Sequence, residues 1–304
     1  MSILVVGSVF VDIKGIPEGA FVPDGRNPGR IETVHGGVAR NVAENAANAG
    51  AETRFLGLAD DSGTGEDVIR RLREAGADVR FMRRVPGGMG TWLAVFDDRG
   101  EVAASISQRP DLRPIAEILD ERGEEIFAGA ESVLLELDLE EVTLERVCTL
   151  AEKHGVPVYA CVSIMSIAVL RRSFLPRLAC LVCNLQELGV LCPGPWEDLS
   201  PEALADRLPE VLEETGLRAM AVTLGAGGSV WAEAGGGTGF CPALPAKVLD
   251  VAGAGDAYFT GVSIGLTRGR SLMEACALGA KLAARVIAVR ESVIPPLPPE
   301  ERFG

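Results

Sequence analysis

The residues best suited to catalysis or ligand binding form one short segment, Asp250-Val-Ala-Gly-Ala-Gly-Asp256. This segment leads into the apolar, helix-like stretch Tyr258–Leu266. Small residues let the backbone approach a ligand closely, and a helix start offers unpaired N–H groups and a positive dipole end to an anion. In phosphoryl transfer a protein mainly positions the groups, spreads the developing charge and supplies one carboxylate as base. The segment thus offers an anion hole and a base beside it: Gly253, Ala254 and Gly255, with Asp256.

A second interpretation of this segment involves no catalysis. Asp256 can be the N-terminal cap of the helix and the glycines a tight turn, because Gly-rich helix starts are common. The segment alone does not separate the two interpretations. The elements that would position it, and motifs elsewhere in the chain, have to be weighed with it.

Apolar, strand-length runs alternate with helical patterns along the chain. Strands are predicted at Ile3–Val6, Thr53–Leu58, Val133–Leu137, Val156–Val162, Cys180–Cys183 and Ala219–Leu224, and helices at Val38–Ala49, Gly65–Glu74, Leu144–His154, Pro201–Glu214, Gly255–Thr267 and Leu272–Val289. This alternation predicts an α/β fold with a doubly wound, mostly parallel sheet covered by helices on both faces. No repeat, low-complexity tract or linker divides the chain, so we expect a single domain over residues 1–304.

Two segments depart from this alternation. Asp12–Val34 is rich in Gly and Pro and has no helical period. Thr91–Ser107 alternates apolar and polar residues around the turn Asp97-Asp98-Arg99-Gly100, which indicates a β-hairpin. The two segments are either a small β lid attached to the main sheet or surface decoration, and the pattern leaves both open.

Composition restricts the partners and the compartment. Of the 304 residues, 47% are hydrophobic and 24% charged, as in ordinary globular proteins, and the net charge of −14 disfavours nucleic acid and anionic membrane surfaces. The longest apolar runs, such as Ser2–Val9, are too short to span a bilayer, and the first residues suggest a buried strand rather than a signal peptide. Seven scattered cysteines do not suggest a disulfide framework, and Cys180 and Cys183 fit a core strand. We therefore expect a cytoplasmic protein.

Five motifs, in order along nearly the whole chain, resemble those of the PfkB, or ribokinase-like, carbohydrate kinase family. The family's C-terminal signature is D-T-x-G-A-G-D at a helix start, and here the segment from Asp250 reads D-V-A-G-A-G-D. The others are Asp12 after the first strand, Gly36-Gly37-Val38-Ala39-Arg40-Asn41 opening a helix, Asn184-Leu-Gln-Glu187, and Thr223-Leu-Gly225-Ala-Gly227-Gly228. Together they favour the catalytic interpretation of Asp256.

The resemblance implies a function for each motif. It implies an α/β body with a β lid, formed here by residues 12–34 and 91–107, that in many members helps to form a homodimer. It implies ATP and Mg²⁺ as cofactors and, often, K⁺ near Asp250, although the usual Thr at the next position is Val251 here. By residue, it implies substrate contacts from Asp12, Gly37 and Asn41, nucleotide contacts from Asn184, Thr223, Gly225 and Gly228, and an indirect Mg²⁺ contact from Glu187.

Within the family the N-terminal half most resembles the pseudouridine kinases, which would add Thr91, Glu136 and Asp138 as substrate contacts. Polar groups at the carboxyl ends of parallel strands suit such a role, but they can equally be solvated loop residues. The subgroup's Lys is replaced by Ser166, Glu136 and Asp138 stand where Asp and Asn are usual, and the lid strand ends in Ser107-Gln108-Arg109. Arg40 can face the pocket or pair with Glu44 four residues on.

These patterns predict ATP-dependent phosphorylation of a hydroxymethyl group on pseudouridine or a related nucleoside. Polar mismatches change specificity strongly, so a kinase for a free sugar or sugar acid is the alternative enzyme. A non-catalytic nucleoside- or sugar-binding protein on the same fold also remains. A dinucleotide-dependent oxidoreductase is disfavoured, because Gly7-Ser-Val-Phe-Val-Asp after the first strand lacks the Gly-x-Gly-x-x-Gly turn.

Overall fold

A computed structural model describes residues 2–303, and within them the largest sheet has eight strands in the order β14-β13-β12-β11-β10-β9-β1-β4. Six neighbouring strands are parallel, and β13 and β14 add an antiparallel edge. The strands are β1 (Ser2–Val6), β4 (Glu52–Leu56), β9 (Ser132–Glu136), β10 (Val158–Cys161), β11 (Cys180–Asn184), β12 (Ala219–Thr223), β13 (Ser229–Glu233) and β14 (Thr238–Cys241). The parallel strands are buried on both faces, as continuous apolar runs require.

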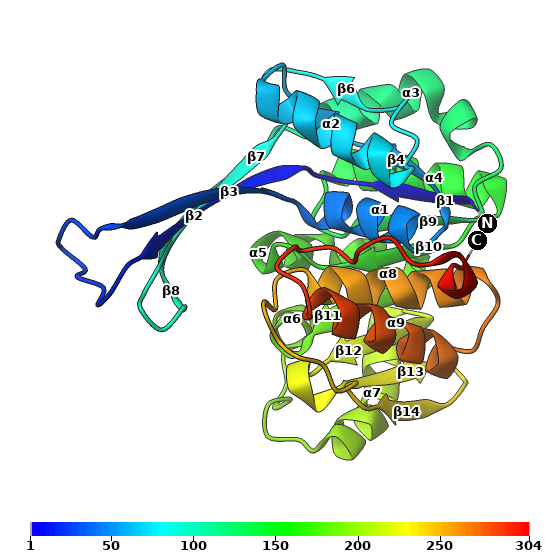
Figure 1. The fold of residues 1–304 in the computed structure, drawn as a ribbon. Coiled ribbons are helices and arrows are strands. Elements are labelled where there is room, and N and C mark those ends of the chain that lie inside the picture. The colour runs from blue at the N-terminus through cyan, green and yellow to red at the C-terminus, as the bar shows by residue number, and fades with distance from the viewer. Residues whose placement is uncertain (1, 304) are drawn as a thin grey trace.

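Helices cover both faces of this sheet (Figure 1). One apolar core includes residues of α1, α2, α8 and α9, and a second core on the other face includes residues of α3, α4 and α7. The helices are α1 (Val38–Asn48), α2 (Gly63–Ala75), α3 (Arg113–Phe127), α4 (Glu141–His154), α5 (Met165–Ala168), α6 (Leu185–Leu191), α7 (Pro201–Thr215), α8 (Ala254–Thr267) and α9 (Leu272–Val286), with 3₁₀ turns η1 (Val169–Arg177), η2 (Gly225–Gly227) and η3 (Pro299–Glu301). The predicted doubly wound α/β fold is confirmed.

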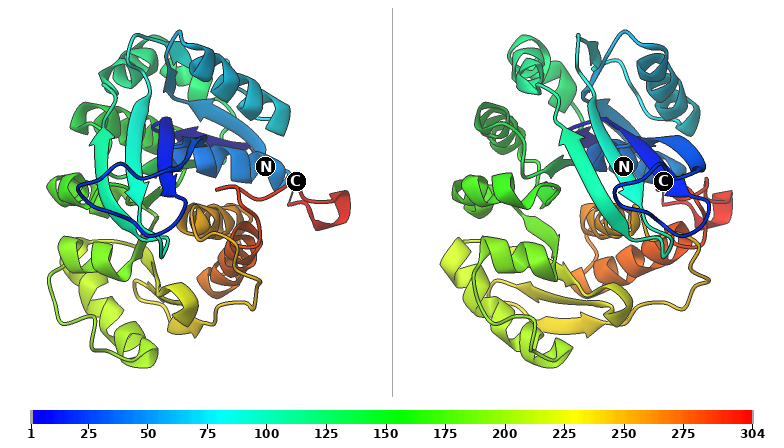
Figure 2. Two further views of the ribbon diagram at one scale, coloured as in Figure 1. Left: turned by 60° about the vertical axis from the view of Figure 1, so that its left-hand side comes forward. Right: turned by 90° about the vertical axis from the view of Figure 1, so that its left-hand side faces the viewer.

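A second sheet projects from the carboxyl edge of the main sheet (Figure 1). Its strand order is β3-β2-β7-β8, with β2 (Phe10–Pro17), β3 (Gly29–Gly36), β7 (Gly90–Phe96) and β8 (Val102–Gln108). Figure 2 (right) looks onto this sheet, with α8 of the body behind it. The two segments that departed from the α/β alternation therefore pair with each other, and we call this sheet the lid.

All the predicted strands and helices are present, with ends shifted by a few residues. The elements that were not predicted include α3, α6, β13, β14 and the 3₁₀ turn η1. Two further short strands, β5 (Leu58–Ala59) and β6 (Arg83–Arg84), pair beside α2. The seven cysteines are buried and unpaired, and Cys180 and Cys183 lie in β11 as predicted. Within residues 2–303, no helix is long and apolar enough to cross a membrane.

Candidate active site

The candidate anion hole is formed by the turn that starts α8. Gly253 is the N-cap residue, with φ 77°, and a Cβ at this position would overlap the carbonyl oxygen of Ser292. Only glycine combines this left-handed backbone with such a close approach. Gly255 has ordinary φ and no neighbouring heavy atom within 4 Å of a built Cβ, so its surroundings are open. The conformational constraint therefore lies at Gly253, whereas Gly255 borders the free space.

The three predicted anion-hole residues are not equivalent as donors. The Ala254 amide donates to the carbonyl of Val251 at 3.3 Å. Within residues 2–303 the Gly255 amide has no backbone acceptor, which is the usual state of a first helical turn. The open position of Gly255 and its unpaired N–H make it the strongest candidate donor to a phosphate.

Asp256 lies in the first turn of α8 and is held by a residue 215 positions earlier. Asn41 Nδ2 donates to Asp256 Oδ2 at 2.6 Å. Burial is the largest influence on this carboxyl and raises its pKa to about 6, while the Asn41 hydrogen bond and the charge of Arg40 act in the opposite direction. At neutral pH the carboxylate is ionised yet basic enough to accept a proton, as a general base should be.

Asn41 has a second polar atom aimed at the same region. Its Oδ1 is buried and has no hydrogen-bond partner within the described residues. Buried acceptors are normally satisfied, so this oxygen needs a donor from outside the chain, such as a hydroxyl group. Gly37, the N-cap of α1, fixes the approach of this helix, because a Cβ there would lie 2.8 Å from both Ser8 O and Phe10 N.

Asp12 approaches this position from the lid. It lies in β2, and its carboxylate is packed so closely on Gly36 that a Cβ at Gly36 would overlap it. Burial raises the Asp12 pKa, opposed by the charges of Lys14 and Arg40, and the Asp12 charge in turn raises the pKa of Asp256. The structure therefore brings Asp12, Asn41 and Asp256 together around one position.

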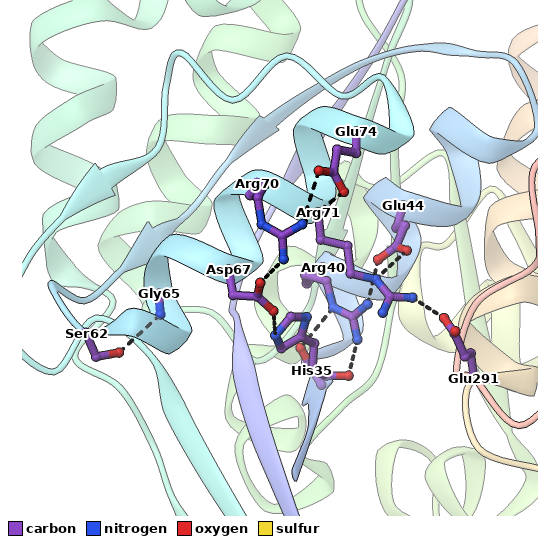
Figure 3. A network of polar contacts seen from close by, with 11 residues as sticks. His35, Arg40, Glu44, Ser62, Gly65, Asp67, Arg70, Arg71, Glu74 and Glu291 are labelled. Carbon is purple, nitrogen blue, oxygen red and sulfur yellow. Dashed lines mark hydrogen bonds and ion pairs between the residues drawn. The ribbon is translucent and has the colours of Figure 1, made fainter.

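The joint between lid and body is held by a buried polar network (Figure 3). Arg40 donates to the carbonyls of His35 and Gly36, the last residues of β3, and to Glu44 Oε2 at 2.7 Å. Glu44 also accepts from Arg71 Nε at 2.8 Å. Since Arg40 and Glu44 are only 2% and 4% exposed, each charge is compensated by its partner. Arg40 thus pairs with Glu44 rather than facing the pocket.

Glu136 and Asp138 lie below the candidate site rather than on its surface. Glu136 is 2% exposed and accepts from Ser8 N at 2.8 Å and Ala39 N at 3.1 Å, so it fixes the start of α1. Burial and the nearby charge of Asp138 raise its pKa above its usual range, while the hydrogen bonds from Ser8 and Ala39 act in the opposite direction. Asp138, 3% exposed, accepts from Ser163 N at 3.0 Å. Glu136 therefore supports the start of α1, and a contact between Glu136 and the substrate stays a prediction.

Thr91 is not brought together with Asp12. In β7 the residue in register with Asp12 is Trp92, whereas Thr91 pairs with Val11. Successive strand side chains point to opposite faces, so Thr91 belongs to the other face of the lid. Trp92, which was not singled out from the sequence, takes the register position beside Asp12, and the substrate contact of Thr91 stays a prediction.

Asn184 and Glu187 form a capping box at the start of α6. Asn184 Oδ1 accepts from Glu187 N at 2.9 Å, and Glu187 Oε2 accepts from Asn184 N at 2.8 Å. Burial raises the Glu187 pKa to about 7, with further contributions from the charges of Asp138 and Asp256. No cluster of three or more metal-ligating side chains occurs in residues 2–303. The Glu187 carboxylate fits the predicted indirect contact with Mg²⁺, since this ion usually keeps several bound waters and binds one or two carboxylates together with substrate phosphates.

The predicted nucleotide turn follows β12. Gly225 has φ 58° and open space around it, so a ligand can approach its backbone. Glycine is needed at position 228 for a different reason, because a Cβ there would overlap the Cys241 carbonyl oxygen. Thr223 Oγ1 lies 3.5 Å from Cys183 O, at the carboxyl end of the sheet. Of these residues, Gly225 has the accessible backbone.

The predicted K⁺ contact of Asp250 stays a prediction, and its carboxylate already has two partners within the chain. Its Oδ1 accepts from Ala252 N at 2.9 Å, and Lys14 Nζ of the lid lies 4.0 Å from its Oδ2. A second cation on this carboxylate would be repelled by the ammonium group.

The sheet, lid and site define a class of protein. A base at a helix start, an adjacent free backbone amide and a lid at the carboxyl edge of a doubly wound sheet suit phosphoryl transfer to a small molecule.

The chain belongs to the pfkB family carbohydrate kinases, which match residues 1–299. It is 34% identical over 298 residues to the guanosine-inosine kinase of Exiguobacterium acetylicum, covering 97% of each chain. It is 26% identical over 268 residues to the pseudouridine kinase of Escherichia coli, covering 86% of this chain and 82% of that one. Arabidopsis thaliana ribokinase complexed with ribose and ATP has the same fold, with TM-score 0.80, 23% identity and coverage of 96% and 95%. The protein is thus an ATP-dependent carbohydrate or nucleoside kinase.

The first prediction concerns the base. Asp256→Asn should lower turnover by about 10²–10⁴-fold, the usual contribution of general-base catalysis, with nucleotide binding retained. In the unmodified protein, kcat/KM should fall as pH drops through about 6, because protonation removes the base. Asn41→Ala removes a hydrogen bond that lowers the pKa of Asp256, so the acidic limb of the pH–rate profile of this variant should move to higher pH. Unchanged turnover in Asp256→Asn would contradict the assignment.

The second prediction separates the two glycines of the anion hole. Gly253→Ala should lower the melting temperature, because the backbone is left-handed and the Cβ overlaps Ser292. Gly255→Val should leave the melting temperature nearly unchanged while turnover collapses, because its side chain enters open space beside the free amide. A Gly255→Val variant with near-normal activity would show that phosphate binds elsewhere.

Proposed function

We propose that this kinase transfers the γ-phosphoryl group of ATP to the hydroxymethyl group of a nucleoside, with 6-oxopurine nucleosides as its preferred acceptors. The observation that carries the proposal is the Asn41–Asp256 pair, which holds a basic carboxylate beside a buried, unsatisfied acceptor. The 34% identity to a guanosine-inosine kinase over the whole chain favours a purine nucleoside over pseudouridine, which the N-terminal motifs alone suggested.

Each part of the site has a role in the transfer. Asp256 takes the hydroxyl proton as the acceptor oxygen bonds to the γ-phosphorus, and the bond from that phosphorus to the bridging oxygen of ADP breaks. The Gly255 amide binds the transferring phosphoryl group, and Asp12 and Asn41 Oδ1 accept hydrogen bonds from acceptor hydroxyls. Glu187 would hold Mg²⁺ through water, and the charge of the ion would assist the transfer.

The third prediction tests the acceptor class. kcat/KM measured for guanosine, inosine, adenosine, pseudouridine, ribose and 2-keto-3-deoxygluconate should be highest for guanosine and inosine. Asp12→Ala should lower acceptor kcat/KM by roughly 10–100-fold, since a hydrogen bond to a charged group contributes about 1.5–3 kcal/mol. The KM for ATP should barely change.

Two outcomes of the acceptor panel would overturn the proposal. Turnover of ribose or the sugar acid but of no nucleoside would make the protein a sugar kinase. Binding of a nucleoside without turnover of any acceptor would favour the non-catalytic alternative.

We also propose that two copies associate through the lid. Its outer face carries large apolar side chains that are unusually exposed for a sheet: Ile31 at 78%, Ile106 at 71%, Leu93 at 42% and Val95 at 36%. The register places Leu93 beside both Ile106 and Ile13, so these side chains are adjacent. A contiguous apolar face suits burial against an identical face.

The fourth prediction follows from this face. The full chain at micromolar concentration should sediment as a dimer, and Ile106→Glu should convert it to a monomer. Ser105→Glu, one position away on the other face of the lid, should leave the dimer intact. A monomeric unmodified chain would contradict the proposal.

A further inference from the structure

Trp92 and Ser107 share the face and the row of Asp12, the candidate substrate contact on the lid. Asp12 of β2 is in register with Trp92 of β7, and Trp92 is in register with Ser107 of β8. Paired residues on neighbouring strands project from the same face of a sheet. An aromatic side chain therefore stands next to the Asp12 carboxylate.

This face of the lid is the one turned to the catalytic centre. The Asp12 carboxylate influences the pKa of Asp256, and two residues further along β2 the Lys14 ammonium lies 4.0 Å from Asp250. Both electrostatic interactions run from the lid to the segment that starts α8. The opposite face carries the exposed Leu93 and Val95.

Trp92 is held in place by its own strand. Its ring packs edge-on against Phe96, with ring centroids 6.4 Å apart, and between them Ala94 is completely buried. Trp92 itself is only partly buried. The fixed ring therefore offers a flat, partly exposed surface next to the Asp12 carboxylate.

Arg109 continues the same side of the lid. It follows β8 directly, two residues after Ser107, and its Nη2 donates to the carbonyl of Asp138 at 3.3 Å. This contact holds the guanidinium near the carboxyl end of β9. The Arg109 charge also acts to lower the pKa of Asp138, and because the side chain is exposed, its remaining N–H groups can donate to a ligand.

We propose that Trp92 and Arg109 form the subsite for the nucleobase. Trp92 stacks on the face of the base, and Arg109 donates to the carbonyl oxygen at C6 of a 6-oxopurine. Arginine pairs readily with O6 and N7 of guanine, whereas the amino group at C6 of adenine is a donor and offers it no acceptor. The inference rests on the proposed nucleoside kinase activity and assigns its specificity to the lid.

The fifth prediction is a set of lid variants assayed with inosine, guanosine, adenosine and ribose. Trp92→Ala should lower kcat/KM for all nucleosides by roughly 10–100-fold, mainly through acceptor KM, because stacking on an aromatic ring contributes on that order per base. Trp92→Phe should restore most of the loss. The KM for ATP and any turnover of ribose should be unaffected. Leu93→Ala, on the outer face of the same strand, is the matched control, and its nucleoside KM should equal that of the unmodified protein whatever its effect on the proposed dimer.

Arg109→Gln should reduce the preference for inosine over adenosine by about 10-fold or more, with little change in the turnover of adenosine. An unaltered preference would overturn the role of Arg109, and normal nucleoside KM in Trp92→Ala would overturn the stacking role. If the unmodified protein phosphorylates sugars but no nucleoside, the proposed function fails first. If nucleosides are good acceptors and the variants change nothing, the activity stands and only the base subsite is wrong.

Discussion

One hydrogen bond between two helices that are far apart in the sequence organises the catalytic centre. Asn41 lies in the first turn of α1 and Asp256 in the first turn of α8, and their 2.6 Å bond requires the two helix starts to meet at the carboxyl edge of the sheet. The two helices pack side by side in the same core, so apolar burial sets their distance. Both helix starts use a glycine N-cap with positive φ, Gly37 and Gly253, whose close contacts would exclude a Cβ.

The lid depends on the same region for its attachment. Arg40 precedes the catalytic partner Asn41 and ties the end of β3 to α1, and Glu44 and Arg71 extend the ties to α2. Losing one buried partner would leave an uncompensated charge, which is far more costly than losing an exposed pair. The carboxylate of Asp12 on β2 and the base Asp256 on α8 can therefore keep a constant distance, although Asp12 belongs to the lid and Asp256 to the body.

Much of the fold was predictable from sequence, because the parallel strands are apolar on both faces and the helices carry clear periods. Helix α3 was not predicted, because Pro114 and Gly123 weaken its helical pattern. Its many polar residues also make the period of the buried residues, such as Ile115 and Leu119, hard to recognise. The site was predictable where backbone shape dictates residue type, as at Gly253. The positions of other site residues were not predictable, because they depend on strand register and on depth in the fold. A shift of one position moves Thr91 away from Asp12 and puts Trp92 beside it, and the burial of Glu136 makes it a support for α1.

The two halves of the site are constrained differently, which bears on how acceptor specificity can change. The phosphate half is built from backbone amides, and its turn depends on Gly253, whose contacts permit no side chain, so substitution at Gly253 disrupts the turn itself. The acceptor half carries side chains on a two-sided sheet, where a substitution changes one contact and leaves the pairing of β2 with β7 intact. Chemistry can therefore stay fixed at α8 while residues such as Trp92 and Arg109 vary with the acceptor. Because polar groups in a binding site discriminate more strongly than apolar ones, few lid substitutions are needed to redirect such a kinase to a different nucleoside or sugar.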